Sequence, residues 1–255
     1  TSLHKKTRRL KSFVLEWDGS GFTKISKDLN WFFRVLNTPD RGDILLGQKG
    51  GRDRNLFFGN VFEMKWESGI YAPAERQILP KGINIYGFAY GDVLNNGREM
   101  IVAFTKKDRI RILARNGEEE WTGTDPYGGS STYLEYPSET DKKKMEHYYL
   151  KQRLYVTDLD KDGKNDVIAV KNEEIAGRLF QRFRRYKSGH IELLTWDNIG
   201  LQTKWKTSKI SGYISDYTIG DHDNDGQDEL VFSVVAKGAG KKFYCVPGAV
   251  LEAEA

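Results

Sequence analysis

The chain has 255 residues, with 40 Lys+Arg against 36 Asp+Glu and a formal net charge of +4. This length suffices for one large domain or two ordinary ones, and an aromatic fraction of 13% excludes an intrinsically disordered chain. The small net charge does not by itself indicate nucleic-acid binding, and a single cysteine, Cys245, excludes an internal disulfide or a Cys-ligated zinc site.

The first residues, 1–8, form a basic segment with neither an initiator Met nor the apolar stretch of a signal peptide. We therefore interpret the chain as a mature product or an excised piece. The longest apolar run, around residues 230–236, is broken by Ser233 and is far shorter than the roughly 20 residues of a spanning helix. The sequence predicts no transmembrane segment.

Four segments share one pattern: an apolar lead-in, a turn that contains Asp or Asn together with Gly, and a short run rich in β-forming residues. They are residues 31–48, 85–104, 154–170 and 213–234. Their turn glycines are Gly42, Gly97, Gly163 and Gly226. Each segment predicts a β-hairpin, and the similar spacing of the glycines indicates one repeated unit.

A second recurring hairpin lies between these segments, with an alternation of apolar and polar residues that runs into a Gly turn. It occupies residues 13–21, 62–69, 111–121 and 192–200, with Trp17, Trp66 and Trp196 in equivalent places. The period of two predicts an all-β fold. Two hairpins per unit form a four-stranded antiparallel blade, and blades arranged radially form a β-propeller.

We expect four to five such blades over residues 9–246. Residues 9–30 supply only a second hairpin, and residues 213–246 supply a first hairpin and one further strand, Lys242–Val246. The two ends combine into one blade of a small ring, or the chain is part of a larger ring; the sequence leaves both open. Residues 247–255 are expected to form a tail.

One interval contains a polar insertion, residues 122–147, whose Pro, Gly, Ser and charge content predicts a loop. Tyr127, Tyr133 and Tyr136 would suit a binding surface there. The alternative is a solvated excursion without a partner.

Two of the hairpin turns are dense in carboxylates. They are Asp158-Leu-Asp160-Lys-Asp162-Gly163-Lys-Asn-Asp166 and Asp221-His-Asp223-Asn-Asp225-Gly226-Gln-Asp-Glu229. Such acids repel one another unless a cation lies among them, and Ca²⁺ accepts about six to eight oxygens in flexible geometry. The glycines are expected to have positive φ. An EF-hand is excluded because position 12 is Ala169 or Phe232 and a β run follows each turn.

These turns resemble the calcium loops of FG-GAP/VCBS repeats, a family that includes the integrin α-subunit propeller and many bacterial exported proteins. The resemblance covers most of residues 10–246. In that family the loop joins the first two strands of a blade, and the acids at positions 1, 3, 5 and 9 bind Ca²⁺ with the carbonyl at position 7. The resemblance thus implies two sites, formed by Asp158, Asp160, Asp162, Lys164 and Asp166, and by Asp221, Asp223, Asp225, Gln227 and Glu229.

The other two hairpins depart from this pattern. In the turn that starts at Asp92, positions 3 and 9 are Leu94 and Met100, which leaves too few oxygens. The turn after Pro39 is shortened, and Asp40 and Asp43 cannot form a cage alone. We expect neither turn to bind metal.

The resemblance implies a calcium-stabilised binding or scaffolding module that recognises a protein or a glycan through loops at one rim. Extracellular calcium modules bind at about 0.1 to 1 mM, so we expect an exported protein: periplasmic, cell-surface or extracellular. The alternative is a propeller-type carbohydrate-active enzyme, a hydrolase or lyase, with carboxylates at the central mouth.

Other functional classes find less support. The four histidines are scattered, and the chain has no zinc-protease motif, nucleophile elbow or P-loop, so no catalytic residue is predicted. Residues 178–187 interleave cations with aromatic residues, as single-strand binders do. We instead expect this run on a strand that leads to a Ser188-Gly189 turn, where basic residues protect a sheet edge. A nucleic-acid partner is therefore disfavoured.

Overall fold

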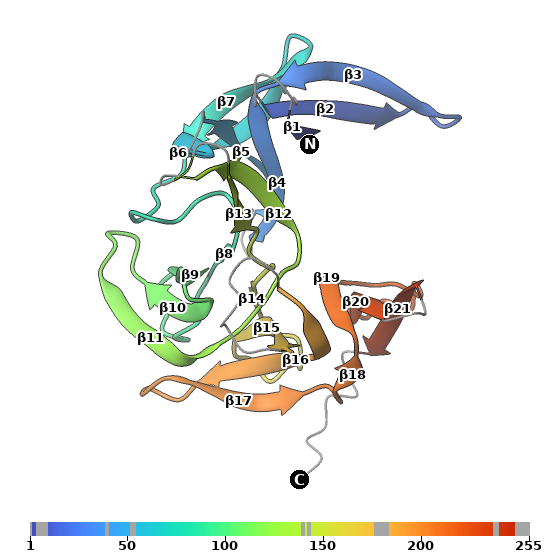
Figure 1. The fold of residues 1–255 in the computed structure, drawn as a ribbon. Coiled ribbons are helices and arrows are strands. Elements are labelled where there is room, and N and C mark those ends of the chain that lie inside the picture. The colour runs from blue at the N-terminus through green and yellow to red at the C-terminus, as the bar shows by residue number, and fades with distance from the viewer. Residues whose placement is uncertain are drawn as a thin grey trace. The chain divides into compact units, whose positions relative to one another are not determined.

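The computed structural model is all-β, and its named strands pair in antiparallel sheets (Figure 1). The structure describes residues 2–3, 10–38, 41–51, 55–138, 141, 144–175, 184–236 and 240–247. Across these residues no helix is long and apolar enough to span a membrane. The chain divides into two compact units, residues 1–85 with 135–148 and residues 86–134 with 149–255.

The first unit holds a three-stranded and a four-stranded sheet, each in sequential order. The strands are β1 (Ser2–Leu3), β2 (Leu10–Trp17), β3 (Phe22–Leu29), β4 (Trp31–Thr38), β5 (Gly42–Gly50), β6 (Phe57–Glu67) and β7 (Ile70–Arg76). A separate hairpin consists of β12 (Tyr133–Pro137) and β13 (Met145–Tyr149).

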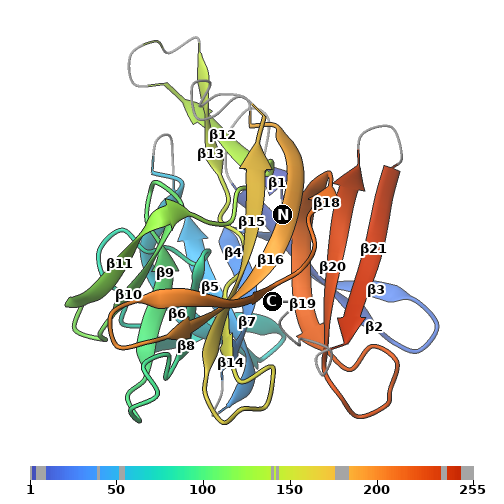
Figure 2. The same ribbon diagram turned by 90° about the horizontal axis from the view of Figure 1, so that it is seen from below.

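The second unit holds three sheets, again in sequential strand order. The first consists of β8 (Phe88–Gly91), β9 (Met100–Phe104), β10 (Arg109–Leu113) and β11 (Glu119–Pro126). The second consists of β14 (Tyr155–Thr157), β15 (Asp166–Glu174), β16 (Tyr186–Trp196), β17 (Leu201–Lys206) and β18 (Ile210–Ser211), which pairs with β16. The third consists of β19 (Tyr213–Gly220), β20 (Glu229–Ala236) and β21 (Gly240–Pro247), which lie side by side in Figure 2.

The middle sheet of the second unit is covered on both faces. Successive side chains of a strand point to opposite faces, and the buried residues of β15 divide accordingly. Val167 and Ala169 pack with the core residues of β8–β10, whereas Ile168 and Val170 pack with those of β19 and β20. Fully burying each of the Val and Ile side chains stabilises the fold by about 1.5–3 kcal/mol. Consecutive sheets therefore stack face to face within this unit.

The predicted hairpins are confirmed. The four first hairpins are β4–β5, β8–β9, β14–β15 and β19–β20, and the four second hairpins are β2–β3, β6–β7, β10–β11 and β16–β17. The three tryptophans are equivalent as expected, because each pairs across its turn with the residue five positions later.

Two expectations about local structure are wrong. Residues 122–147 are not a loop throughout: β11 continues to Pro126, and β12 and β13 pair with each other. Aromatic residues such as Tyr133 favour strands despite the polar composition. Ser188 and Gly189 do not form a turn but lie inside β16, where β15 pairs with them on one side and β18 on the other.

Some expectations fall on residues outside the described ranges. These are most of the basic segment 1–8, Asp40, most of the 178–187 run and the tail after Pro247.

Candidate metal sites

Three loops of the second unit occupy the same place, each between the first two strands of its sheet. We call them the Asp92 loop (Asp92–Met100), the Asp158 loop (Asp158–Asp166) and the Asp221 loop (Asp221–Glu229). Their φ angles agree closely, at 53° to 62° for position 4 and 80° to 87° for position 6. The residues concerned are Asn95, Lys161 and Asn224, then Gly97, Gly163 and Gly226. The positive φ of the glycines is confirmed. The positive φ of the residue at position 4 was not predicted from the sequence.

The aspartate at position 1 holds each turn in shape. Asp158 accepts hydrogen bonds from the backbone amides of Asp162 and Gly163, at 3.0 and 2.9 Å. The same two bonds recur at Asp221, at 3.1 and 3.0 Å, and at Asp92, at 3.0 and 2.6 Å. Side chain to backbone bonds of this kind stabilise turns. The loop conformation is therefore encoded by the chain itself.

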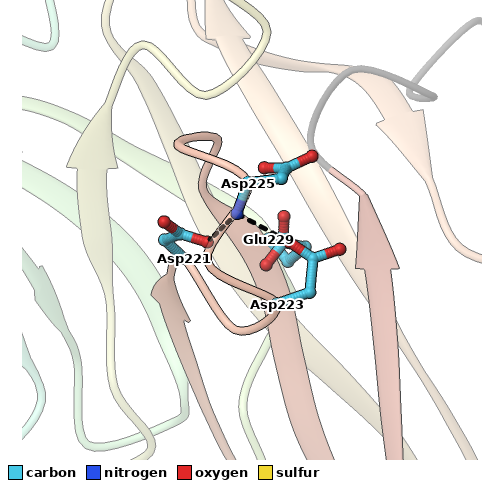
Figure 3. A group of neighbouring side chains, drawn as sticks. All are labelled: Asp221, Asp223, Asp225 and Glu229. Carbon is cyan, nitrogen blue, oxygen red and sulfur yellow. Dashed lines mark hydrogen bonds between the residues drawn. The ribbon is translucent and has the colours of Figure 1, made fainter.

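The Asp221 loop gathers four acids. Asp221, Asp223, Asp225 and Glu229 each offer a carboxylate oxygen, and these oxygens all lie within 4.8 Å of one another (Figure 3). The three aspartates are exposed, whereas Glu229, the first residue of β20, is only 4% exposed. This set of hard oxygens fits a calcium ion. The side chain of His222 between them is exposed.

The Asp158 loop gathers three acids in the same way: Asp158, Asp160 and Asp162. The fourth, Asp166, lies outside this group, at the start of β15, and is fully buried. Among the described residues, neither Oδ1 of Asp160 nor Oδ1 of Asp166 has a hydrogen-bond partner, although both atoms are buried. Buried carboxylate oxygens without a donor fit a bound cation.

Burial also determines the electrostatics of Asp166. It raises the pKa of the Asp166 carboxyl, and the nearby Thr195 hydroxyl and Lys204 ammonium only partly offset this effect. A positive charge close to Asp166 would favour its ionised form.

A lysine from a different strand reaches into the Asp158 loop. Lys204 Nζ lies 2.5 Å from Asp160 Oδ2, 2.6 Å from Asp162 Oδ2 and 3.5 Å from Asp166 Oδ2. Burial acts to lower the pKa of Lys204, but these contacts outweigh burial and raise it. The hydrogen bond and the charge of Lys204 in turn lower the pKa of Asp162. The sequence did not predict this residue.

The residues at position 7 are also fixed. The backbone amides of Lys164 and Gln227 each donate to the aspartate two residues earlier, both at 2.8 Å. Ligation of a cation by their carbonyl oxygens stays a prediction.

The Asp92 loop uses its other positions for packing. Leu94 and Met100, at positions 3 and 9, are 9% and 3% exposed and belong to the hydrophobic core between the first and second sheets of this unit. In the first unit, the side chain of Asp43 accepts a hydrogen bond from Asn37 at 3.0 Å.

The Asp92 loop also supports its neighbour. Asn95 Oδ1 accepts a hydrogen bond from the backbone amide of Asn165 at 2.7 Å, and Asn95 Nδ2 donates to the carbonyl of Asn165 at 3.2 Å. The side chain of Asn165 donates back to the carbonyl of Asp92 at 3.3 Å. Since Asn165 precedes Asp166, these bonds fix position 8 of the Asp158 loop.

Asn95→Ala is expected to lower the free energy of unfolding by about 1–2 kcal/mol more than Asn224→Ala, as measured by urea denaturation. Both variants place alanine at a left-handed position 4, so Asn224→Ala accounts for the backbone strain. Only Asn95 has hydrogen bonds to the backbone of a neighbouring loop among the described contacts. Equal losses in the two variants would show that the bridge contributes nothing.

A buried polar hub lies in the middle sheet. Glu192 on β16 is 4% exposed, and its carboxylate accepts hydrogen bonds from the hydroxyls of Tyr127 at 2.8 Å and Thr203 at 2.9 Å. His190 Nε2 lies 2.7 Å from the other oxygen, and Lys171 Nζ is 3.7 Å from it. From the sequence alone, the histidines are scattered, and Tyr127 is suited to a binding surface, with a solvated excursion as the alternative. The His-x-Glu spacing, which puts both side chains on one face of a strand, was the available sign.

No family model matches the chain, and no curated protein shows significant similarity to it.

Proposed function

We propose that the chain is a calcium-stabilised β-propeller module of an exported protein, which binds a protein or glycan partner through its rim loops. The observation that carries this proposal is the group of four carboxylates in the Asp221 loop, repeated with three carboxylates at the corresponding place in the Asp158 loop. Crowded carboxylates are stabilised by a cation among them.

The propeller part of the proposal is supported by the second unit. Its sheets follow one another along the chain, are antiparallel and stack face to face. Both candidate loops join the first two strands of their sheets, β14–β15 and β19–β20. This is the arrangement expected of blades.

The ligand types favour calcium. The described acidic groups contain only carboxylates, with no His or Cys that would favour zinc. Magnesium prefers a strict octahedron and retains its waters, whereas calcium accepts an irregular set of oxygens. Extracellular calcium modules bind at about 0.1 to 1 mM, a concentration met outside the cell, and export is proposed on this ground.

The test is a calcium titration of the thermal unfolding midpoint. At a free concentration about 100 times Kd, each occupied site adds about 2.7 kcal/mol, which corresponds to a rise in Tm of roughly 5–10 °C for a protein of this size. The double variant Asp160→Ala, Asp223→Ala is expected to lose this rise.

A matched control is Glu119→Ala, Glu120→Ala, which removes two exposed acids from β11 and should keep the full rise. Absence of a rise in the wild type, or the same rise in the Asp160→Ala, Asp223→Ala variant, would contradict calcium binding in these loops.

A further inference from the structure

The two acidic loops differ in the surroundings of their carboxylates. No ion pair joins an acid of the Asp221 loop to any residue that the structure describes, whereas Lys204 pairs with Asp160, Asp162 and Asp166. These three are the acids at positions 3, 5 and 9 of the Asp158 loop. The lysine therefore contacts the same groups that are proposed to hold calcium.

The path of β17 explains how Lys204 reaches the loop. Leu193 of β16 pairs with Trp205, but the next residue, Leu194, pairs with Thr203, so Lys204 is the extra residue of a β-bulge. A bulge changes the direction of a side chain relative to a regular strand. The bulge therefore accounts for a side chain of β17 that points at the turn between β14 and β15.

Some carboxylate oxygens in the cage of acids around Lys204 do not contact its ammonium. The ammonium contacts the Oδ2 atoms, while Oδ1 of Asp160 and Oδ1 of the fully buried Asp166 have no hydrogen-bond partner among the described residues. One ammonium has only three donors, whereas calcium accepts about six to eight oxygens at 2.3–2.6 Å. The two cations need the same carboxylates and repel each other, so both cannot occupy the cage.

We infer that Lys204 is a built-in competitor of Ca²⁺ in the Asp158 loop, so that this loop binds calcium more weakly than the Asp221 loop. The inference rests on the proposed function, since it concerns the affinity of the same loops. Lys204 is 29% exposed, and its flexible stem lets the ammonium move into solvent when calcium enters. Without calcium, the ammonium neutralises the crowded carboxylates. The middle sheet thus keeps a stable turn at calcium concentrations that fill only the Asp221 loop.

The test is isothermal titration of the full chain with CaCl₂, in an Asp223→Ala background that leaves only the Asp158 loop to bind. Lys204→Met and Lys204→Gln are expected to lower Kd at least about tenfold. Lys204→Arg keeps the competing charge and should not tighten binding. Lys206→Met removes the same charge from an exposed residue of the same strand, and should leave Kd within about threefold.

The outcomes separate the inference from the proposed function. Tighter binding in the two neutral Lys204 variants alone supports the competitor, and so does binding that appears only in those variants. Another result is that calcium binds the Asp221 loop in the wild-type background while the neutral Lys204 variants leave the Kd of the Asp158 loop unchanged. That result would refute the role of Lys204 as a competitor and leave the proposed function intact. If no variant binds calcium in either loop, both are refuted. Circular dichroism without calcium confirms that each variant is folded.

Discussion

Glu192→Ala is expected to lower the free energy of unfolding by about 3–5 kcal/mol at pH 7, and this loss is expected to shrink as the pH falls below about 4.5. The side chain is the common acceptor for two hydroxyls and lies beside His190 in a buried part of the middle sheet. Alanine would leave these groups without their partner. A buried polar group that loses its partner costs about 1–3 kcal/mol.

The pH dependence follows from the pKa of Glu192. Burial acts to raise it, but hydrogen bonds with His190, Tyr127 and Thr203 outweigh burial and lower the pKa to about 2, from an ordinary value of 4.5. Because the folded value lies below the unfolded one, the contribution is fully present above pH 4.5 and is lost as the pH falls toward 2. A shift of this size corresponds to about 3 kcal/mol.

The measurement is urea denaturation of the wild type and the variant between pH 7 and pH 3, with a chelator present so that the acidic loops stay free of metal. Glu120→Ala, an exposed acid of β11 in the same unit, should change stability by less than about 0.5 kcal/mol at every pH. A loss below 1 kcal/mol for Glu192→Ala, or a loss that stays constant down to pH 3, would show that the hub does not stabilise the fold as its geometry implies.

The parts of the structure that the sequence predicted are those set by local chemistry. The hairpins follow from a period of two and from Gly turns, and both act over a few residues. The acidic loops are equally local, because the aspartate at position 1 bonds amides four and five residues later. The conformation of Gly163 could therefore be predicted from its own nine-residue turn.

The parts that escaped prediction depend on residues far apart in the chain. Lys204 is 38 residues from Asp166, and it reaches that residue from the bulge in β17. Asn95 is 70 residues from Asn165. Neither contact leaves a mark in composition or periodicity, because the first depends on the register of β16 and β17 and the second on the packing of two successive sheets.

The Ser188-Gly189 error has the same origin. Small polar residues favour turns when the chain is free to reverse, but two flanking strands satisfy their backbone groups on both sides. Backbone pairing outweighs local turn preference at this position.

Asp166→Asn is expected to have opposite effects with and without calcium. Burial raises the pKa of the Asp166 carboxyl, so its negative charge is unfavourable in the metal-free fold. Without calcium, removing that charge should leave the free energy of unfolding the same or raise it by up to about 1 kcal/mol. With calcium at about 100 times the Kd of the Asp158 loop, most of the roughly 2.7 kcal/mol of stabilisation should be lost, because a neutral amide is a weaker ligand than a carboxylate with a free Oδ1.

These opposite changes in stability, with and without calcium, are expected only of a residue that is unfavourable in the metal-free fold and required for metal binding. A residue that merely supports packing would lose stability in both conditions. Urea denaturation with calcium and with chelator, in the Asp223→Ala background, measures both effects on the Asp158 loop. Asp228→Asn makes the same chemical change at an exposed residue outside the proposed ligands and should alter neither value. A fall of more than 2 kcal/mol without calcium, or an undiminished calcium effect, would mean that Asp166 is a structural residue and that its buried oxygen has no role in holding a cation.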